Sequence, residues 1–480
     1  MLFSAQQKAD DAAGSGVGRR ALLRAGALGG GSVLALAAGG TATASTAAAR
    51  AAATATTAAA GAARKPSFAL FTQSDLNFET LFALGSAGYG CAEVGEIVTT
   101  VNEINARGAT YQNYYDLFAE RALRTEQIAD GQLAAGHTVS ARSAYLRAAT
   151  YYDLCLFFVL GTRQHADEAS VYARMQRNWN AAARLFDPPF ERVRIPYDGT
   201  WLPGYFLSPD SSRTARPTVI LNNGSDAQNV DLYTFGGAAA LERGYNALIF
   251  EGPGQGSMLF ERTIPYRPDW QHVVTPIVDW LRARPDVDSG RIAITGWSMC
   301  GASVIEAAGY EHRLAAVVAD PGVLDAWAVW PEDVRKLADS GAGKAEINRI
   351  WTGDVIPHIR GVSAFTVKKR SELFTREALA AGRAGHIFTD LYDLSLVLKK
   401  VNCIAEAPRV TTPTLITEYQ DDAFFPHGSQ AGAVYARLPK HLRKELRRFT
   451  VAEGAEYHDA PMAPQTRNQV VFDWLDGVLG

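Results

Sequence analysis

The sequence predicts an α/β protein in which a mostly parallel sheet is covered by helices and is preceded by a helical segment. Two observations support this fold class. From about residue 190 onward, short β-type runs alternate with helical patterns, as expected when parallel strands are joined by helices. Before that point, residues 65–188 carry apolar residues at three- and four-residue spacing with few β-type runs, which is typical of packed helices.

The first 64 residues have the features of a leader and a linker. Arg19 and Arg20 precede two leucines, a glycine-softened apolar stretch and a small-residue site at 42–44, which predicts a twin-arginine signal peptide over residues 1–44. The apolar stretch is too short and too rich in glycine to favour a transmembrane anchor. Residues 45–64 are almost entirely alanine and threonine, which predicts a disordered linker. We therefore expect export by the twin-arginine pathway to the cell envelope or the medium, with no membrane attachment after the signal is removed.

The composition limits the possible partners. The chain has 480 residues, 47 % of them hydrophobic, and a formal charge of −3, which suits a large buried core and excludes a nucleic-acid binder. Its four cysteines show neither a C-x-x-C pair nor the spacing of metal ligands. We expect no disulfide framework, no metal and no cofactor, and a small-molecule substrate as the partner.

The elements follow in order from these patterns. Five helices are expected in the helical domain of residues 65–188, at 77–84, 92–106, 112–131, 139–161 and 166–185. Residues 190–208 predict a hairpin that turns at Tyr197 to Thr200. Further strands are expected at 218–222, 247–251, 291–295, 315–319, 414–418 and 448–452. These strands assign residues 189–480 to a catalytic domain, with a helical insert at about 322–410 that would help to cover its site.

The most informative motif lies at residues 291–308, which read as a buried strand, a sharp turn with Ser298 at its apex, and a helix. This is the nucleophile elbow of an α/β-hydrolase, in which the helix N-terminus supplies N–H groups to a developing oxyanion. The G-x-S-x-G pattern is nearly complete, with Cys300 in place of the second glycine and Gly301 directly after it. The alternative is a chance Gly-x-Ser in a strand-to-helix turn.

The other two members of a triad occur in the chain order of this fold, serine, then acid, then histidine. Asp422 lies in the loop after the expected strand at 414–418, and His458 lies in the last loop before the final helix. We assign His458 as the general base and Asp422 as its orienter. Asp421 and Asp320 remain alternative acids, and His427 is a second histidine near the acid loop.

An oxyanion hole needs two N–H donors. One should be Met299, directly after the nucleophile, and the other should be Gly224 or Ser225, in the loop after the strand at 218–222. The glycine-rich stretch 252–256 lacks the spacing of a phosphate-binding loop and is interpreted as a structural turn.

Several stretches together resemble one family. They are residues 136–152, the glycine-rich turn at 252–256, the elbow at Ser298, the loop ending at Pro426, and residues 453–458. The joint pattern, over about residues 70–480, is similar to the 2,6-dihydroxypseudooxynicotine hydrolase group, which includes fungal pigment-pathway hydrolases of the Ayg1 type (DUF1100-like). The resemblance implies a helical lid over a Ser-Asp-His site, a frequent homodimer, and hydrolysis of a carbon–carbon bond next to a ketone. Cys300 departs from the family pattern.

We therefore expect an exported serine hydrolase that acts on a carbonyl substrate, with ketone hydrolysis of an aromatic or polyketide-like compound as the first interpretation. A carboxylesterase or acyl-peptidase-like hydrolase is the alternative, because ester and carbon–carbon cleavage need the same three residues. A non-catalytic binding protein is a third interpretation. Aromatic residues of the helical domain would either bind the substrate or form helix core: Tyr111, Tyr114, Tyr115, Tyr151, Tyr152, Phe157 and Phe158.

Overall fold

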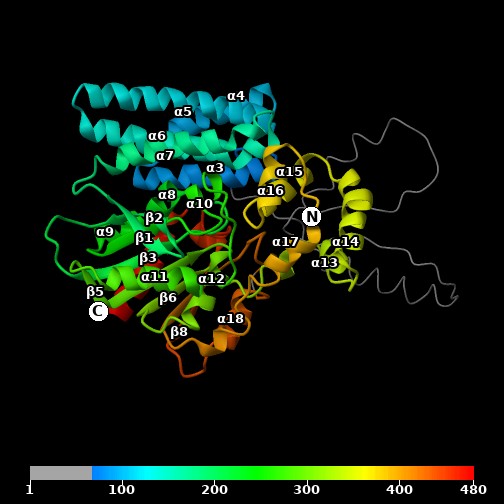
Figure 1. Ribbon diagram of the computed structural model, residues 1–480. Helices are drawn as coiled ribbons and strands as arrows, with labels where there is room; N and C mark the ends of the chain where they lie inside the picture. Colours follow the sequence, from blue (N-terminus) through cyan, green and yellow to red (C-terminus); the bar gives the residue numbers. More distant parts are fainter. Residues whose placement is uncertain (1–67, 427) are drawn as a thin grey trace, which may run out of the picture.

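A computed structural model describes residues 68–426 and 428–480 of the chain, so the expected signal peptide and linker, and His427, lie outside the described residues. Its centre is an eight-stranded sheet with the order β1-β2-β4-β3-β5-β6-β7-β8 (Figure 1). The strands are β1 (Glu191–Tyr197), β2 (Thr200–Leu207), β3 (Arg216–Asn222), β4 (Asn246–Phe250), β5 (Val287–Trp297), β6 (Ala316–Asp320), β7 (Thr414–Tyr419) and β8 (Lys444–Phe449). β2 pairs antiparallel with β1 and β4, and all other pairs are parallel. The predicted mostly parallel sheet is confirmed.

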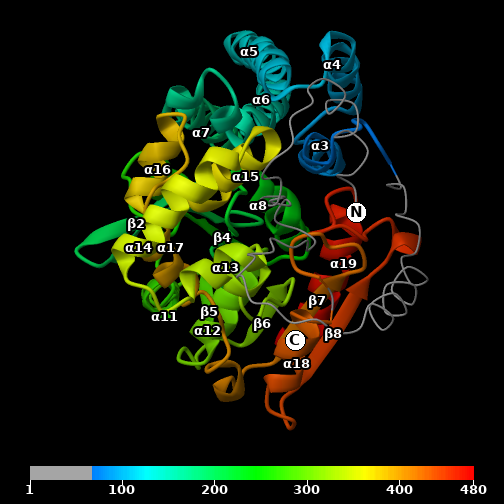
Figure 2. The ribbon, with the colours of Figure 1, turned by 90° about the vertical axis from the view of Figure 1, so that its right-hand side faces the viewer.

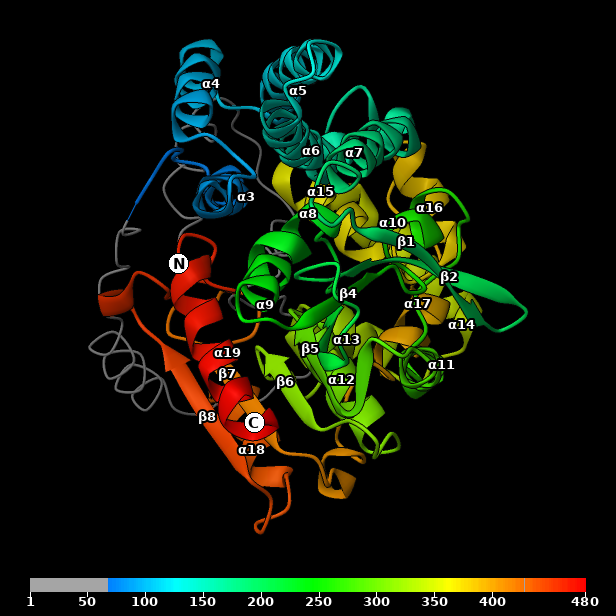
Figure 3. The same cartoon turned by 90° about the vertical axis from the view of Figure 1, so that its left-hand side faces the viewer.

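Helices cover both faces of this sheet (Figure 3). α11 (Gln271–Arg282) and α12 (Cys300–Ala308) lie on one face, and α9 (Ala238–Glu242) and α19 (Pro464–Leu479) lie on the other. The side chains of β3 alternate accordingly, with Ile220 in the core beneath α11 and α12, and Val219 and Leu221 in the core beneath α19. β4, β6 and β7 are buried along their whole length because both faces are covered.

The expected hairpin is present between β1 and β2, where Tyr197 pairs with Thr200. Asp198 and Gly199, between them, both have positive φ, as a two-residue hairpin turn of this kind requires. The strand expected at 448–452 is wrong in its position. β8 begins at Lys444 and ends at Phe449, because a capping box between Thr450 and Glu453 starts a short 3₁₀ helix there instead.

The N-terminal helices gather at one end of the molecule, beyond the sheet (Figure 1). They are α3 (Ser74–Ser86), α4 (Val94–Arg107), α5 (Tyr111–Ala134), α6 (Thr138–Phe158) and α7 (Glu168–Ala183), so a helix occupies each of the five expected stretches. Two short helices, α8 (Asn229–Leu232) and α10 (Gly256–Phe260), follow β3 and β4. None of the helices in the described ranges is long and apolar enough to cross a membrane.

The chain between β6 and β7 folds as helices, some of which lie beside the N-terminal ones (Figure 2). These are α13 (Glu332–Ala338), α14 (Lys344–Ile350), α15 (Gly361–Ser371), α16 (Arg376–Arg383) and α17 (Leu391–Leu398), and α18 (Ala431–Arg437) follows β7. Phe365 of α15 packs against the rings of Tyr111 and Phe158, with centroids 4.6 and 5.4 Å away. Two segments far apart in the sequence therefore pack against each other.

Candidate active site

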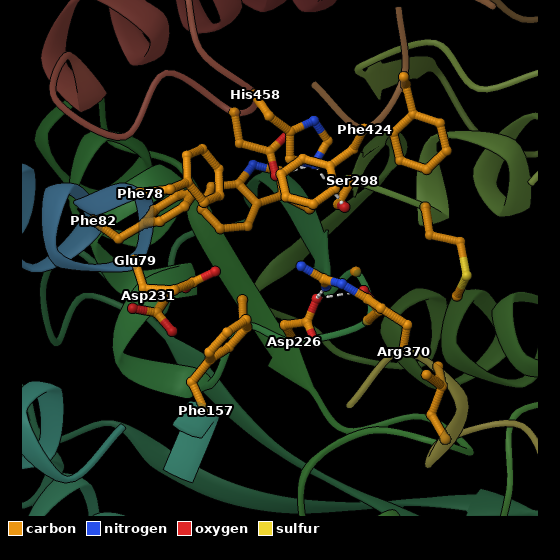
Figure 4. A pocket seen from close by; sticks show the side chains of 18 of the residues that line it. Phe78, Glu79, Phe82, Phe157, Asp226, Asp231, Ser298, Arg370, Phe424 and His458 are labelled. Carbon is orange, nitrogen blue, oxygen red and sulfur yellow. Dashed lines mark hydrogen bonds and ion pairs between the residues drawn. The ribbon is translucent and has the colours of Figure 1, made fainter. Parts of the chain in front are cut away.

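Ser298, His458 and Asp422 form a hydrogen-bonded line, of which Figure 4 labels Ser298 and His458. The Ser298 Oγ lies 2.8 Å from His458 Nε2, and His458 Nδ1 lies 2.8 Å from Asp422 Oδ2. Ser298 has a φ of 51°, the strained conformation that lifts a nucleophile out of a strand-to-helix turn. The elbow between β5 and α12 therefore has the geometry that its sequence predicts.

Close backbone contacts fix this elbow. A Cβ at Gly296 would lie 2.3 Å from the Cys300 carbonyl oxygen, and one at Gly301 would lie 1.9 Å from the Pro321 carbonyl oxygen. The Cys300 side chain does not have to fit into these close contacts. It is buried beside the turn after β4, with its Sγ 3.7 Å from Gln255 Nε2. The departure from the family pattern is therefore accommodated by the neighbouring turn. All four cysteines are free and buried.

Of the three candidate acids, Asp422 is the one beside the histidine. Its second oxygen, Oδ1, accepts hydrogen bonds of 2.8 Å from the N–H groups of Phe424 and Phe425, which hold the carboxylate in place. Asp421 is exposed. Asp320 is buried and forms an ion pair with Arg467.

The loop after β3 lies directly against Ser298. A Cβ at Gly224 would be 2.7 Å from the Ser298 Cβ, so a larger residue has no room there. Gln255 holds this loop, because its Nε2 donates to the carbonyl oxygens of Asn223 and Gly224 at 2.7 and 2.9 Å. Gly224, Ser225 and Met299 all line the cavity in front of Ser298.

That cavity has a volume of about 1180 Å³, including its solvent-open mouth. Figure 4 labels four of its aromatic lining residues, Phe78 and Phe82 of α3, Phe157 of α6 and Phe424 of the acid loop. The other aromatic residues that line it are Trp297, Trp330, Phe374 and Phe425. Among the seven aromatic residues that the sequence singled out, Phe157 lines this cavity, whereas Tyr114, Tyr151, Tyr152 and Phe158 are helix core.

Charged groups in the cavity are shielded from water. Arg370 of α15 forms an ion pair with Asp226, and its guanidinium lies 4.9 Å from the Phe424 ring centroid. Burial opposes ionisation of Asp226, but Arg370 and Lys369 outweigh it and lower the pKa of this carboxyl. Burial raises the pKa of Glu79, on the opposite wall, to about 8.

The candidate base is itself perturbed. Burial lowers the pKa of His458, but the carboxyl groups of Asp422 and Asp459 outweigh it and raise the pKa above its ordinary 6.5. His458 is 5 % exposed, so water screens these charges poorly. The imidazolium that forms on proton uptake is therefore stabilised.

Sequence reasoning missed three groups at this site: Gln255, the Arg370–Asp226 pair, and Asp459. The stretch that contains Gln255 was interpreted as a structural turn, so no role was predicted for this residue. Its position between two glycines is the feature of the sequence that could have drawn attention to it. Arg370 and Asp226 are 144 residues apart, and no local pattern joins them. Asp459 follows the histidine directly but belongs to no catalytic motif.

A serine on a nucleophile elbow, a histidine and an acid in hydrolase chain order, and a mostly parallel sheet covered on both faces define an α/β-hydrolase. The family model for FrsA-like esterases matches residues 112–337. The chain is 32 % identical to 20-hydroxy-prefusarin hydrolase FUS2 of Gibberella moniliformis, over 85 % of this chain and 98 % of that protein. It is 28 % identical to hydrolase ORFZ of Pyricularia oryzae, over 84 % of this chain and 96 % of that protein. The protein belongs to this FrsA-like family of α/β hydrolases.

One solved structure extends the similarity to the whole described fold. The 2,6-dihydroxy-pseudo-oxynicotine hydrolase superimposes with a TM-score of 0.63 at 20 % identity, and the match covers 84 % of this chain and 96 % of that one. The resemblance on which the sequence analysis relied is thus confirmed for the family and the fold.

Proposed function

We propose that this hydrolase uses Ser298 as nucleophile, His458 as general base and Asp422 as the orienter of the imidazole. The carrying observation is the pair of 2.8 Å contacts that joins the three side chains at the elbow. His458 Nε2 takes the Ser298 proton as Oγ attacks a carbonyl carbon, while Asp422 fixes the tautomer through Nδ1. The N–H groups of Met299 and of the Gly224–Ser225 loop stabilise the oxyanion.

The substrate class that the cavity favours is a neutral, aromatic or polyketide-like ketone, cleaved at the carbon–carbon bond next to the carbonyl. Phenylalanine rings line the cavity, and burial raises the pKa of Glu79 so that its carboxyl is neutral over much of the physiological range. A relative that matches along nearly its whole length is named as the hydrolase of 20-hydroxy-prefusarin. A carboxylesterase is the second candidate, because the same elbow and base serve an alcohol leaving group.

We also propose that the protein is exported, on the strength of the Arg19–Arg20 pair and the weakly apolar stretch behind it. Replacing both arginines by lysine should leave the protein in the cytoplasmic fraction of a host with a twin-arginine pathway. Equal export of both forms would contradict this proposal.

The test of the reaction compares the purified protein with Ser298→Ala and with Ser211→Ala, a control in an exposed loop. Each protein is incubated with aryl esters, β-diketones and acyl-phenol ketones, and the products are identified by mass spectrometry. Ketone cleavage to an acid and a shortened ketone or arene, lowered about 10⁴-fold or more in Ser298→Ala alone, supports the proposal. Ester turnover without ketone cleavage would favour the esterase, and equal activity in all three proteins would exclude Ser298 as nucleophile.

A further inference from the structure

Asp459 lies in the same tight turn as the catalytic histidine. The Ala460 N–H donates to the Tyr457 carbonyl oxygen at 2.8 Å, which places His458 and Asp459 at the two central positions of the turn. Asp459 has a φ of 61°, a left-handed conformation that aspartate and asparagine adopt more readily than most residues. Strained backbone of this kind is concentrated at functional sites. Both side chains line the cavity in front of Ser298.

The contacts of Asp459 separate it from an ordinary orienting acid. Its Oδ2 lies 3.2 Å from His458 Nε2, the same nitrogen that faces the Ser298 Oγ, whereas Asp422 occupies Nδ1. Its other oxygen, Oδ1, is buried and has no hydrogen-bond partner within the described part of the chain. Asp459 is only 3 % exposed. A buried polar atom that no protein group satisfies, on the wall of a substrate cavity, has the substrate as its natural partner.

Burial favours the neutral form of this carboxyl and a protonated His458 favours its ionised form, so the two groups titrate as a pair. Burial raises the pKa of Asp459, and the nearby carboxylates of Asp320 and Asp422 raise it further, while His458 and Arg467 oppose them without cancelling the rise. The other groups that face the His458–Asp459 pair are Tyr419 of β7 and Arg370 of α15. Arg467 forms its ion pair with Asp320, and the basic group in contact with Asp459 in the described part of the chain is His458.

We propose that Asp459 is the acid that protonates the leaving group, and that His458 then restores the proton of Asp459. This inference rests on the proposed function, since it needs Ser298 as nucleophile. The two groups that contact His458 Nε2 then have different tasks: Ser298 attacks the carbonyl carbon, and Asp459 protonates the leaving group.

The steps balance as follows. Ser298 Oγ bonds to the carbonyl carbon and its proton moves to His458 Nε2. The bond to the leaving group breaks, the leaving group keeps the electron pair, and the Asp459 proton is transferred to it. The imidazolium proton crosses the 3.2 Å contact to the Asp459 carboxylate. Water then attacks the acyl-enzyme and gives one proton to His458, which passes it to Ser298 as the ester bond breaks.

A second acid has most value when the leaving group is a poor one. A 4-nitrophenolate departs without a proton, whereas an alkoxide or the carbanion or enolate of a ketone needs one during departure. General acid catalysis contributes about 10²- to 10⁴-fold in such steps. The dependence of the rate on the leaving group therefore reports on Asp459 separately from the nucleophile.

The test uses the full-length protein, its Asp459→Asn variant and the control Asp421→Asn, whose carboxyl is exposed. Asparagine keeps the size and tolerates the positive φ but cannot supply a proton in this way. The substrates share one acyl group and run from the 4-nitrophenyl ester through phenyl and ethyl esters to the matching β-diketone. We expect Asp459→Asn to hydrolyse the 4-nitrophenyl ester within about threefold of wild type and to lose about 10²-fold or more on the ethyl ester and the diketone. Asp421→Asn should match wild type across the series.

A loss of equal size on every substrate, or no loss on any, would overturn the proposal. Wild-type protein gives a second reading that does not depend on a variant folding correctly. Its pH profile for the ethyl ester or diketone should be bell-shaped, because Asp459 must be protonated, whereas the 4-nitrophenyl ester should give a profile with an acid limb only. Profiles of the same shape for both substrates would also overturn it.

Labelling with a fluorophosphonate keeps the two proposals distinguishable. Unlabelled wild-type Ser298, or undiminished activity in Ser298→Ala, would refute the nucleophile itself and with it the role of Asp459. Normal labelling of wild type and of Asp459→Asn, with no change in the leaving-group dependence, would refute the role of Asp459 alone.

Discussion

Replacing Gln255 is expected to change both the stability of the fold and the rate of catalysis, and the two effects can be measured separately. Its amide joins the turn after β4 to the loop after β3, through hydrogen bonds of 2.7 and 2.9 Å to the Asn223 and Gly224 carbonyl oxygens. Gln255→Leu keeps the approximate volume and removes both donors. The Asn223 carbonyl oxygen keeps the Asn222 amide as a donor. The Gly224 carbonyl oxygen loses its partner, and so does the Gly252 N–H, which donates to Gln255 Oε1. Each buried group left unpaired costs about 1–3 kcal/mol, so we expect the free energy of unfolding to fall by about 2–6 kcal/mol.

The catalytic effect follows from the position of Gly224 against Ser298. Without Gln255 the loop is free to move away from the nucleophile, and an oxyanion donor moves with it. Loss of one such donor costs about 10²- to 10³-fold in kcat, with little change in KM. The assay is urea unfolding together with kcat and KM on an aryl ester, beside the exposed control Gln465→Leu. A variant that is destabilised as expected but retains its kcat would refute the reasoning that this turn holds the oxyanion loop.

Three further results are expected. Asp422→Asn should lower kcat about 10⁴-fold through the wrong imidazole tautomer, with Asp421→Asn unaffected; similar losses in both would contradict the assignment of the acid. The acid limb of kcat/KM should lie above pH 6.5, because the folded-state pKa of His458 is raised and the base is lost as the pH falls through it; a limb below pH 6 would contradict this sign. Arg370→Met should raise the pKa of Asp226 and lower the unfolding free energy by about 1–3 kcal/mol, since it leaves a half-buried carboxylate without its cation; unchanged urea unfolding would show that the ion pair does not stabilise the fold.

The sheet and the line of three side chains could be predicted because their signals are local or depend only on chain order. The elbow is predicted from eleven consecutive residues. The close contacts around its strained serine require glycine at positions 296 and 301, and both glycines are visible in the sequence. The sequence placed Asp422 in the loop after a late strand but left Asp421 open as an alternative acid. The structure supplies a physical reason for Asp422, since the N–H groups of Phe424 and Phe425 bind its carboxylate.

The missed parts depend on how distant segments meet. Gln255 acts on a loop about thirty residues earlier, and Arg370 of the insert reaches the same loop across 144 positions. The strand at 448–452 was misplaced because β8 is a half-exposed edge strand whose charged residues obscure its alternation. The prediction of the domain boundaries stays a prediction.

The N-terminal helices influence the chemistry as well as the shape of the cavity. α3 packs so tightly on the histidine loop that a Cβ at Gly85 would lie 1.9 Å from the Pro461 carbonyl oxygen, two residues after Asp459. The Phe78 ring of the same helix lies 6.5 Å from the His458 ring, centroid to centroid. This cover contributes to the burial that favours the neutral form of Asp459, because a carboxyl open to water at that point would ionise well below neutral pH. In the mechanism that we propose, a hydrolase core without such helices would retain Ser298 and His458, whereas the cover by α3 is what would make Asp459 available as an acid for leaving groups that cannot depart alone.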